Sequence, residues 1–528
     1  MIKVLFFSPF VTGPRQGGAK IQEIREMVNA LLVYPEYPDT FWSWKRIMKV
    51  IRKEAAFPPL GLLTVAAMMP ASWKKKLVDM NVSRLRDKDI KRADYVFISA
   101  MIAQTDSARE VISRCNKLGV KVVAGGPLFT TGYESFQGVD VFFVGEAENT
   151  FGIFLKDLEK GCPKPIYKSD EWPDLSTSPI PLWELIRQKD YVCLSVQSSR
   201  GCPFNCEFCA VIIMNGRGSR VKQPEQVLAE VEAIRRTGYR GNVFVVDDNF
   251  IGNVPKAKEI SAKLIEWQEE SGNPFTFTTQ ASINLADSEE LMHLMAEAGF
   301  EQVFLGLETP SAEGLAECGK LQNQRRDVVA CVQKLQSHGF HTPAGFIVGL
   351  DSDTEAIFDQ LIGFIQRSGV VVAMAGLLQA LPKTKLFKRL MEEHRLLETS
   401  SGNNTDIILT FVPKMDPRVL IAGYKRVLRT IYSPEKYYER ICNFLEKYRP
   451  RKRRSQRMSL GSLLAFARSV WYIGIVGERE ERRYYWKTLR TAWTKYRKSF
   501  SEAVALQIYG LHLRQIANLI SDSEQGSL

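Results

Sequence analysis

The sequence predicts an α/β protein with three parts: an N-terminal Rossmann-like parallel sheet, an incomplete βα barrel of six units, and a helical C-terminal domain. Short β-branched runs alternate with helical patterns through the first two parts. After about residue 417 the pattern becomes helical, aromatic and basic. The expected divisions are residues 1–160 for the first domain, 161–190 for a linker, 191–415 for the barrel and 416–528 for the helical domain.

The first domain is expected to contain short buried strands separated by helices, at 58–70 and 107–119 among others. The expected strands cover residues 27–37, 75–80, 94–100, 120–127 and 139–146. Residues 1–26 fit this pattern poorly and read either as a first strand or as an extension ahead of Met27, rather than as a signal peptide. The stretch KPIYKSDEWPDLSTSPIP is rich in Pro, Asp and Ser, which is typical of a linker.

The second βα series supplies the barrel. Its expected strands cover residues 192–201, 242–248, 275–283, 302–309, 342–350 and 370–381, with helices such as 224–238 between them. In such a barrel, ligands bind at the carboxyl ends of the strands.

Composition limits the setting. The chain has 528 residues, a net charge of +12 and nine cysteines. An odd number of cysteines in a long chain argues against a disulfide scaffold and favours a reducing cytoplasm. No stretch reaches about 18 uninterrupted apolar residues, and the nearest candidate, 460–476, is broken by Arg468. We therefore expect a cytoplasmic protein, with peripheral contact at the inner face of the membrane left open.

The segment GCPFNCEFCAV places Cys202, Cys206 and Cys209 on one loop just after an expected strand. Three thiolates in this arrangement can ligate three irons of a [4Fe–4S] cluster and leave the fourth iron open. A zinc site or three unrelated thiols are the alternatives. Zinc would require a fourth Cys or His at ligand spacing, and no histidine precedes His293.

This spacing, with the aromatic Phe208 before the last cysteine, resembles the signature of the radical S-adenosylmethionine superfamily. The resemblance implies that the open iron binds S-adenosylmethionine, whose reductive cleavage yields a 5′-deoxyadenosyl radical. It also implies cofactor contacts near the strand ends, at Phe208, Asp247, Asp248, Asn249, Gln280, Ser282 and Glu308. Helix capping by Asp248 or Asn249 and solvation of Glu308 are the alternatives.

The first domain resembles the cobalamin-binding domain found ahead of many radical S-adenosylmethionine barrels. The residues that carry the resemblance are Ser99, Gly125, Gly126, Pro127, Gly145 and Glu146. Glycines at strand ends let the backbone pack close to a large planar ligand. The domain contains no histidine that could bind cobalt. A residue near 102–106, or water, would therefore face the lower side of the cobalamin. A related domain without cofactor is the alternative.

Further motifs are similar to the branch of this family that includes bacterial hopanoid methylases: VDDNFIGN (246–253), FLGLETP (304–310) and LLQALPKTKLFKRL (377–390). The resemblance implies methylation of an unactivated carbon in a hydrophobic, lipid- or tetrapyrrole-like substrate, with flavodoxin or ferredoxin as electron donor. Radical oxidation or cyclisation, and an iron–sulfur redox or sensing protein, remain alternatives. Arg217 and Arg220 are expected near the mouth of the cluster.

The C-terminal domain carries the basic and aromatic segments 448–457 and 481–498. Such segments form solvated helical faces, contact anionic lipid, or bind nucleic acid electrostatically. A solvated face is the default, an apolar substrate would favour lipid, and nucleic acid is not expected.

Overall fold

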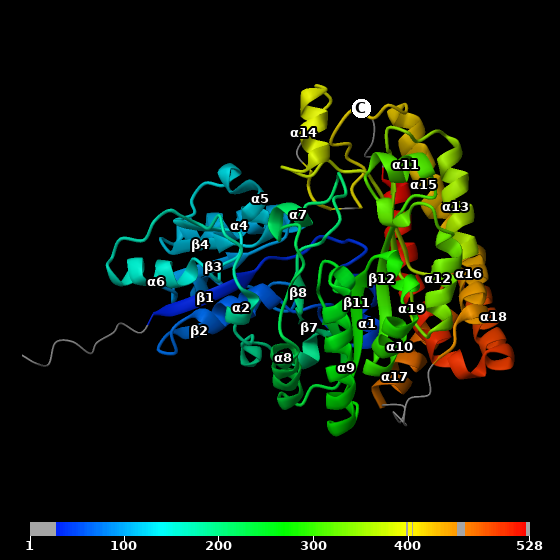
Figure 1. Ribbon diagram of the computed structural model, residues 1–528, viewed down its shortest axis with the longest axis horizontal. Coiled ribbons are helices and arrows are strands. Elements are labelled where there is room, and N and C mark those ends of the chain that lie inside the picture. Colours follow the sequence, from blue (N-terminus) through cyan, green and yellow to red (C-terminus); the bar gives the residue numbers. More distant parts are fainter. Residues whose placement is uncertain (1–27, 398–399, 404, 451–459, 524–528) are drawn as a thin grey trace, which may run out of the picture.

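The computed structural model describes residues 28–397, 400–403, 405–450 and 460–523 (Figure 1). The expected first strand within residues 1–26 lies outside the described residues. In Figure 1 the N-terminal sheet is on one side, the βα barrel is in the centre, and the C-terminal helices line the opposite side.

The N-terminal sheet is fully parallel, with strand order β2-β1-β3-β4-β5-β6. Both of its faces are buried, since Leu31 and Val33 lie in one apolar cluster while Ala30 and Leu32 lie in another. Helices α2 and α6 cover one face, and α3, α4 and α5 cover the other. The strands are β1 (Asn29–Tyr34), β2 (Lys74–Asp79), β3 (Tyr95–Ser99), β4 (Lys121–Gly125), β5 (Val141–Val144) and β6 (Ile166–Lys168); the helices are α2 (Leu60–Met68), α3 (Asp87–Ile90), α4 (Thr105–Lys117), α5 (Pro127–Gly132) and α6 (Phe151–Glu159). The Rossmann-like prediction is confirmed.

Strand β6 is a difference from the sequence-based expectation, because it lies inside the segment 161–190 that reads as a linker. It pairs in parallel with β5 and adds an edge strand to the sheet. Only the middle residue, Tyr167, is buried, where its ring stacks on Phe143 at 5.4 Å. Three residues among prolines and charged groups give no recognisable alternation, so the sequence hides this strand.

The second sheet is a six-stranded open barrel in the order β7-β10-β11-β12-β13-β14, and every pairing is parallel. Its strands are β7 (Leu194–Val196), β10 (Gly241–Val245), β11 (Phe275–Ala281), β12 (Phe300–Glu308), β13 (Ala344–Val348) and β14 (Ala373–Leu377). The covering helices are α8 (Pro224–Arg236), α9 (Val254–Glu270), α10 (Glu289–Ala298), α12 (Val328–Ser337) and α13 (Ala356–Ser368). The predicted six-unit barrel is confirmed.

Alternation along β11 separates the two faces of this sheet. Phe275 and Phe277 are buried under α9 and α10, whereas Thr276, Thr278 and Gln280 are only half-buried on the inner face. Short elements complete the barrel: the antiparallel pair β8 (Ser199–Arg200) and β9 (Arg220–Val221), with α7 (Val211–Met214), α11 (Ala312–Glu317) and α14 (Lys385–Glu392).

The C-terminal helices cover the free edge of the barrel at β14. The Tyr424 hydroxyl donates to the Ala375 carbonyl at 3.2 Å, and the Tyr432 hydroxyl donates to that of Ala373. Such cover protects an exposed strand edge from pairing with another chain. The helices are α15 (Pro417–Ile431), α16 (Pro434–Lys447), α17 (Leu460–Ser469), α18 (Arg479–Lys495) and α19 (Phe500–Asp522). No helix within the described ranges is both long and apolar enough to cross a membrane.

The connection between β1 and α2 leaves the first sheet and packs on the other two parts. It contains α1 (Met48–Ile51). Trp42 lies 4.9 Å from Phe304 of the barrel, and Phe57 lies 5.4 Å from Phe244, measured between ring centroids. Next to Trp42, the carbonyl oxygens of Thr40 and Phe41 contact His512 of α19. This excursion therefore joins all three parts into one body.

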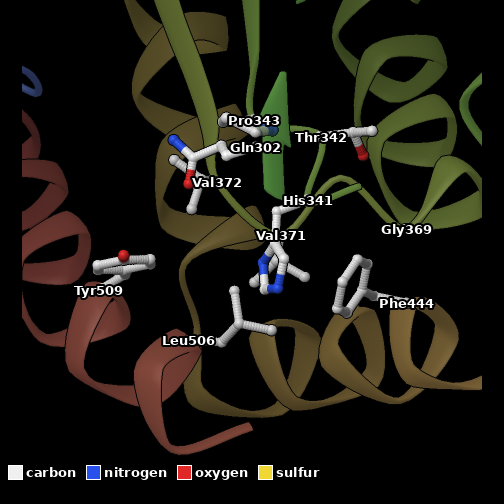
Figure 2. A pocket seen from close by; sticks show the side chains of 10 residues that line it. All are labelled: Gln302, His341, Thr342, Pro343, Gly369, Val371, Val372, Phe444, Leu506 and Tyr509. Carbon is white, nitrogen blue, oxygen red and sulfur yellow. The ribbon is translucent and has the colours of Figure 1, made fainter. Parts of the chain in front are cut away.

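A small cavity lies where the segment before β13 meets α16 and α19 (Figure 2). His341 lies beside it, with its ring 4.9 Å from that of Phe444 and 5.0 Å from that of Tyr448. Burial lowers the pKa of His341 to about 4 because an imidazolium ion would lose its hydration there.

This burial predicts an acid-sensitive core. The stabilising effect of neutral His341 is fully present above the unfolded pKa of about 6.5 and is lost as the pH falls through about 4. Between pH 7 and pH 4, wild type should lose about 3 kcal/mol more unfolding free energy than His341→Phe does. Urea denaturation of both proteins measures this difference, and parallel pH profiles would refute it.

Candidate functional site

The three cysteines of the motif lie on a tight loop between β8 and α7. The Cys209 amide donates to the Cys206 carbonyl at 3.2 Å, and the Cys202 amide donates to the Gly216 carbonyl at 3.3 Å. The loop begins at Gly201, whose φ of +93° places it in the left-handed region. A Cβ atom there would lie 2.3 Å from the Gly218 carbonyl oxygen, so only glycine fits.

Gly201→Ala should therefore disturb the cysteine loop while the rest of the fold survives. We expect a loss of about 2 kcal/mol in stability, from left-handed strain and the close backbone contact. Iron bound per chain after anaerobic reconstitution should fall in parallel. Gly218→Ala is a suitable control, because no atom lies within 4 Å of its Cβ position.

Asp247 and Asp248 accept hydrogen bonds from the residues that lead into this loop. Asp247 is fully buried, and its carboxylate accepts hydrogen bonds from the Ser198 amide at 2.7 Å and the Ser199 hydroxyl at 2.7 Å. Asp248 accepts from the Gly201 amide at 2.8 Å. Both carboxylates are directed at the protein, so Asp247 and Asp248 position the cysteine loop. Cofactor contacts had been expected for both residues from the sequence.

Asn249 lies directly beside the cysteines. Its side-chain amide nitrogen is 4.0 Å from the Cys202 sulfur and donates to the Ser282 hydroxyl at 3.1 Å. The Ser282 amide in turn donates to the side-chain oxygen Oδ1 of Asn249 at 3.1 Å. Gln280 stands on the inner face of the adjacent strand, half-buried. The structure thus brings Asn249 to the edge of the cysteine loop and Ser282 against Asn249, with Gln280 near the end of the neighbouring strand.

Glu308 ends β12 with a φ of +63°, an unusual conformation for a residue with a side chain. Its carboxylate pairs with the Lys320 ammonium at 2.8 Å, and both side chains are nearly buried. Burial alone would lower the pKa of Lys320, but Glu308 and the neighbouring thiol of Cys206 together raise it. A fixed positive charge therefore stands beside the cysteines, and no local sequence pattern signals it.

Phe208 packs against a separate apolar cluster that includes Leu350, Leu378 and Leu386. A fourth thiol, Cys318, lies close enough to influence Cys206 electrostatically, but its sulfur is directed at the Leu315 carbonyl oxygen, 3.7 Å away. The described part of the chain therefore offers three neighbouring thiols on one loop and a fourth that faces elsewhere.

The residues fit a [4Fe–4S] cluster. Burial raises the pKa of all three thiols, that of Cys209 to about 12, so they are protonated in the absence of metal. Bound iron would hold them as thiolates. Lys320 stands close enough to favour that negative charge.

The carboxyl edge of the first sheet collects the residues expected to bind cobalamin. Ser99, Gly125 and Gly145 follow or end three neighbouring strands, and Pro127 begins α5. Gly126 has a φ of +88°, and a Cβ atom there would lie 2.5 Å from the Ser99 hydroxyl. No atom lies within 4 Å of the Cβ position of Gly145. A close-packed backbone beside open space fits a large planar ligand.

Glu146 differs from the expectation, because its carboxylate is bound by two arginines of the barrel. Arg200 and Arg220, which form the β8–β9 pair, both donate to it. Arg200 also pairs with Glu148 at 2.7 Å. The four side chains are between 5% and 22% exposed. This group, which we call the interdomain clamp, ties the cobalamin-side loop to the strands on either side of the cysteines.

Sequence reasoning missed the clamp, although Arg220 had been expected near the cluster mouth. Arg220 is turned towards Glu146 and also covers the Trp172 ring at 5.2 Å, whereas Arg217 is exposed. The sequence shows only that charged residues, Glu146 and Arg200 among them, stand beside the two motifs. Their spacing does not reveal that they pair with each other.

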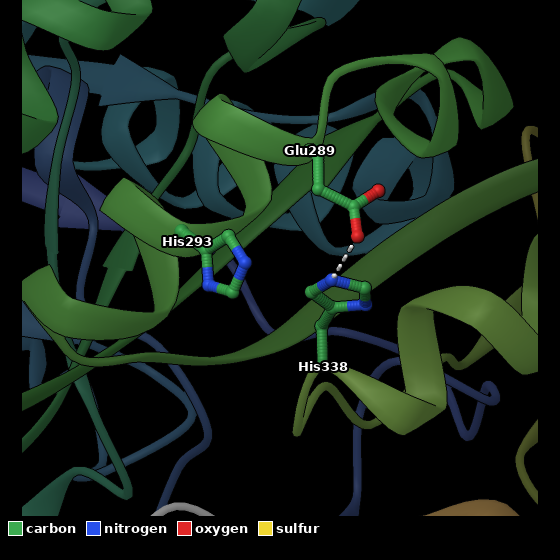
Figure 3. A group of neighbouring side chains, drawn as sticks. All are labelled: Glu289, His293 and His338. Carbon is green, nitrogen blue, oxygen red and sulfur yellow. Dashed lines mark ion pairs between the residues drawn. The ribbon is translucent and has the colours of Figure 1, made fainter.

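A second group of potential metal ligands lies on the outer helices of the barrel. Figure 3 shows the Glu289 carboxylate facing His338, with His293 beside them. The distance from His338 Nε2 to Glu289 Oε1 is 3.3 Å, and Lys334 binds the other carboxylate oxygen at 2.8 Å. Because an ammonium group already neutralises this exposed carboxylate, we assign no metal to it.

Family models match successive parts of the chain. A B12 binding domain matches residues 50–155, the Radical SAM superfamily matches residues 196–365, and a domain of unknown function, DUF4070, matches residues 384–526.

Two curated relatives match over most of their length. An uncharacterized methyltransferase of Synechocystis sp. is 39% identical over 87% of this chain and 86% of its own. The hopanoid C-2 methylase of Rhodopseudomonas palustris is 31% identical over 85% of this chain and 86% of its own.

Among solved structures, the methyltransferase TsrM from Kitasatospora setae, with tryptophan and a S-adenosylmethionine analogue bound, superposes with a TM-score of 0.59 at 14% identity, covering 88% of this chain and 99% of that one. The cobalamin-dependent enzyme OxsB, with aqua-cobalamin and S-adenosylmethionine bound, gives 0.58 at 14% identity, covering 95% and 82%. At this identity the likeness shows a shared fold.

Proposed function

Because the chain belongs to the cobalamin-dependent radical S-adenosylmethionine methyltransferases, we propose that it methylates an unactivated carbon of a hydrophobic, lipid- or tetrapyrrole-like substrate. The family uses a [4Fe–4S] cluster, S-adenosylmethionine and cobalamin, which together supply a carbon-centred radical and a methyl group to quench it. No protein acid or base is needed for hydrogen abstraction.

One observation carries the hydrophobic substrate class: part of the inner face of the barrel is apolar and aromatic, beside the polar Thr276, Thr278 and Gln280 of β11. Phe244, Phe304 and Ile347 occupy that face, and the excursion between β1 and α2 adds Trp42 and Phe57 against them. Apolar and aromatic walls favour ligands that lose water on binding. The hopanoid methylase among the relatives is named for a substrate of this class.

We assign the cofactor contacts as follows. Cys202, Cys206 and Cys209 would ligate the cluster. Asn249, Gln280 and Ser282, and with them Phe208 and Glu308, would line the S-adenosylmethionine side, while Asp247 and Asp248 position the loop. The residues that would face cobalamin are Ser99, Gly125, Gly126, Pro127 and Gly145. Glu146 would hold their loop in place through its contacts with Arg200 and Arg220. We retain the proposed domain divisions at 1–160, 161–190, 191–415 and 416–528. Strand β6 falls in the second of these ranges but belongs to the sheet of the first domain.

We further propose that the protein works in a reducing cytoplasm with flavodoxin or ferredoxin as electron donor. The nine cysteines are free and no two are bonded. Contact with the inner face of the membrane belongs to the same proposal, since a hydrophobic substrate would reside there.

The test uses S-adenosylmethionine with a deuterated methyl group. Anaerobically reconstituted enzyme is incubated with lipid and pigment extracts from a strain that lacks the gene, and products are analysed by mass spectrometry. A hydrophobic product that gains the labelled methyl supports the proposal. A product without added methyl, accompanied by 5′-deoxyadenosine and little S-adenosylhomocysteine, would instead indicate oxidation or cyclisation.

A further inference from the structure

The outer surface of the C-terminal helices carries an uncommon concentration of exposed aromatic and basic side chains. Four tryptophans of the chain are exposed by 46% to 56%, and three of them, Trp471, Trp486 and Trp493, lie on this surface. The fourth, Trp172, is covered by the Arg220 guanidinium elsewhere. Exposed tryptophans gathered on one surface indicate a partner with an apolar layer near a polar one.

Helix α18 arranges these residues in a stripe. Arg482, Trp486, Arg490 and Trp493 follow one another at spacings of four, four and three residues, which places them on one helical face. The Arg497 guanidinium then lies 4.7 Å from the Trp493 ring centre. Tyr485, Leu489 and Ala492 on the adjoining face of the helix are buried against the protein, whereas the residues of the stripe are exposed.

The π-helical segment Val470–Ile475 extends this surface. The Trp486 ring nitrogen donates to the Gly474 carbonyl at 3.0 Å, and Arg482 donates to that of Ile475 at 3.1 Å. These bonds bring Ile475, 49% exposed, and Val476, 61% exposed, beside the stripe. We call this combined area the Arg–Trp surface.

Charge on this segment has one sign. Residues 482–498 contain seven basic residues, namely Arg482, Arg483, Lys487, Arg490, Lys495, Arg497 and Lys498, and no acidic one. In Figure 1, α18 lies on the side of the molecule away from the N-terminal sheet, so a large flat partner could approach it without touching that sheet.

We propose that the Arg–Trp surface docks the enzyme on an anionic phospholipid bilayer. Tryptophan rings settle at the level of the headgroups, arginine stems cover apolar surface while their guanidinium groups reach phosphates, and Ile475 and Val476 enter the acyl boundary. This docking rests on the proposed hydrophobic substrate, because it would keep the enzyme beside the phase that holds such a substrate.

The experiment is sedimentation of the full-length protein with vesicles of phosphatidylcholine alone and of phosphatidylcholine mixed with phosphatidylglycerol. Wild type should bind the anionic vesicles and release them at high salt. Arg482→Glu and Arg490→Glu should each weaken partitioning by about fivefold or more. Trp471→Ser with Trp493→Ser should weaken it by about tenfold, because binding scales with the apolar area buried.

Two matched controls test position. Ile153→Ser removes a side chain that is 48% exposed on the N-terminal domain, and Arg236→Glu reverses a charge whose side chain is 77% exposed on α8. Both should bind vesicles as wild type does. Circular dichroism and S-adenosylmethionine cleavage by each reconstituted variant verify that the fold is retained.

Equal binding by all variants, no preference for anionic vesicles, or a dimer in solution that the tryptophan variants dissociate would each overturn the docking surface. Nucleic-acid binding lost in the same variants, without vesicle binding, would also overturn it. These outcomes leave the proposed methylation intact, since labelled product can still form from detergent-dispersed extract. Vesicle binding without any hydrophobic methylated product would instead remove the substrate proposal alone.

Discussion

Replacement of Cys209 by alanine is expected to abolish reductive cleavage of S-adenosylmethionine. The change removes one of three thiols on a loop that has no substitute ligand, because Cys318, a further thiol close enough to influence Cys206, faces the Leu315 carbonyl. Changes outside the ligand shell of a metal site commonly cost about 10- to 100-fold in activity, and loss of a ligand should cost more. The measurements are iron content, cluster spectrum and 5′-deoxyadenosine formed under reducing conditions.

Cys162→Ala and Cys115→Ala serve as controls, since Cys162 is exposed and Cys115 is buried in the N-terminal domain, both away from the loop. Each should retain the cluster and the cleavage activity. Full cleavage activity in Cys209→Ala, at normal iron content, would remove the assignment of this loop as the cluster site.

The positions of the strands along the chain could be predicted because burial repeats locally. In β11, Phe275 and Phe277 alternate with Thr276 and Thr278, so a period of two is visible without any knowledge of the neighbours. Strand β6 escaped notice because only Tyr167 is buried and three residues cannot display a period.

The candidate site divides in the same way. Spacing alone placed the three cysteines on one loop, and position at a strand end placed Asp247, Asn249 and Glu308 near it. What each side chain faces depends on residues far along the chain: Asp247 binds Ser198, 49 residues away. Lys320, 12 residues after Glu308, reaches it because the chain beyond α11 folds back to the end of β12. Which group a carboxylate faces therefore depends on the tertiary structure and cannot be read from a sequence motif.

The interdomain clamp leads to the second large expected effect. Glu146 follows Gly145 directly and is bound by Arg200 and Arg220 across the boundary between the two sheets. Removing one partner of a nearly buried pair leaves an uncompensated charge, which costs about 3–5 kcal/mol. We expect Glu146→Ala to lower the unfolding free energy by about 3 kcal/mol. Urea denaturation measures it, and cobalamin retained after desalting should fall at the same time.

A double-mutant cycle separates the clamp from general damage. If Glu146 and Arg220 act on each other, the combined Glu146→Ala and Arg220→Ala variant should be more stable than the sum of the single effects predicts, by about 1 kcal/mol or more. Glu259→Ala is the matched control, since its pair with Lys256 is 33% to 50% exposed and should be worth less than about 1 kcal/mol. Additive effects, together with unchanged cobalamin retention, would mean that the clamp does not hold the cobalamin-side loop against the cluster. Coupling in both measurements would show that the same charges fix how the two cofactor sites face each other.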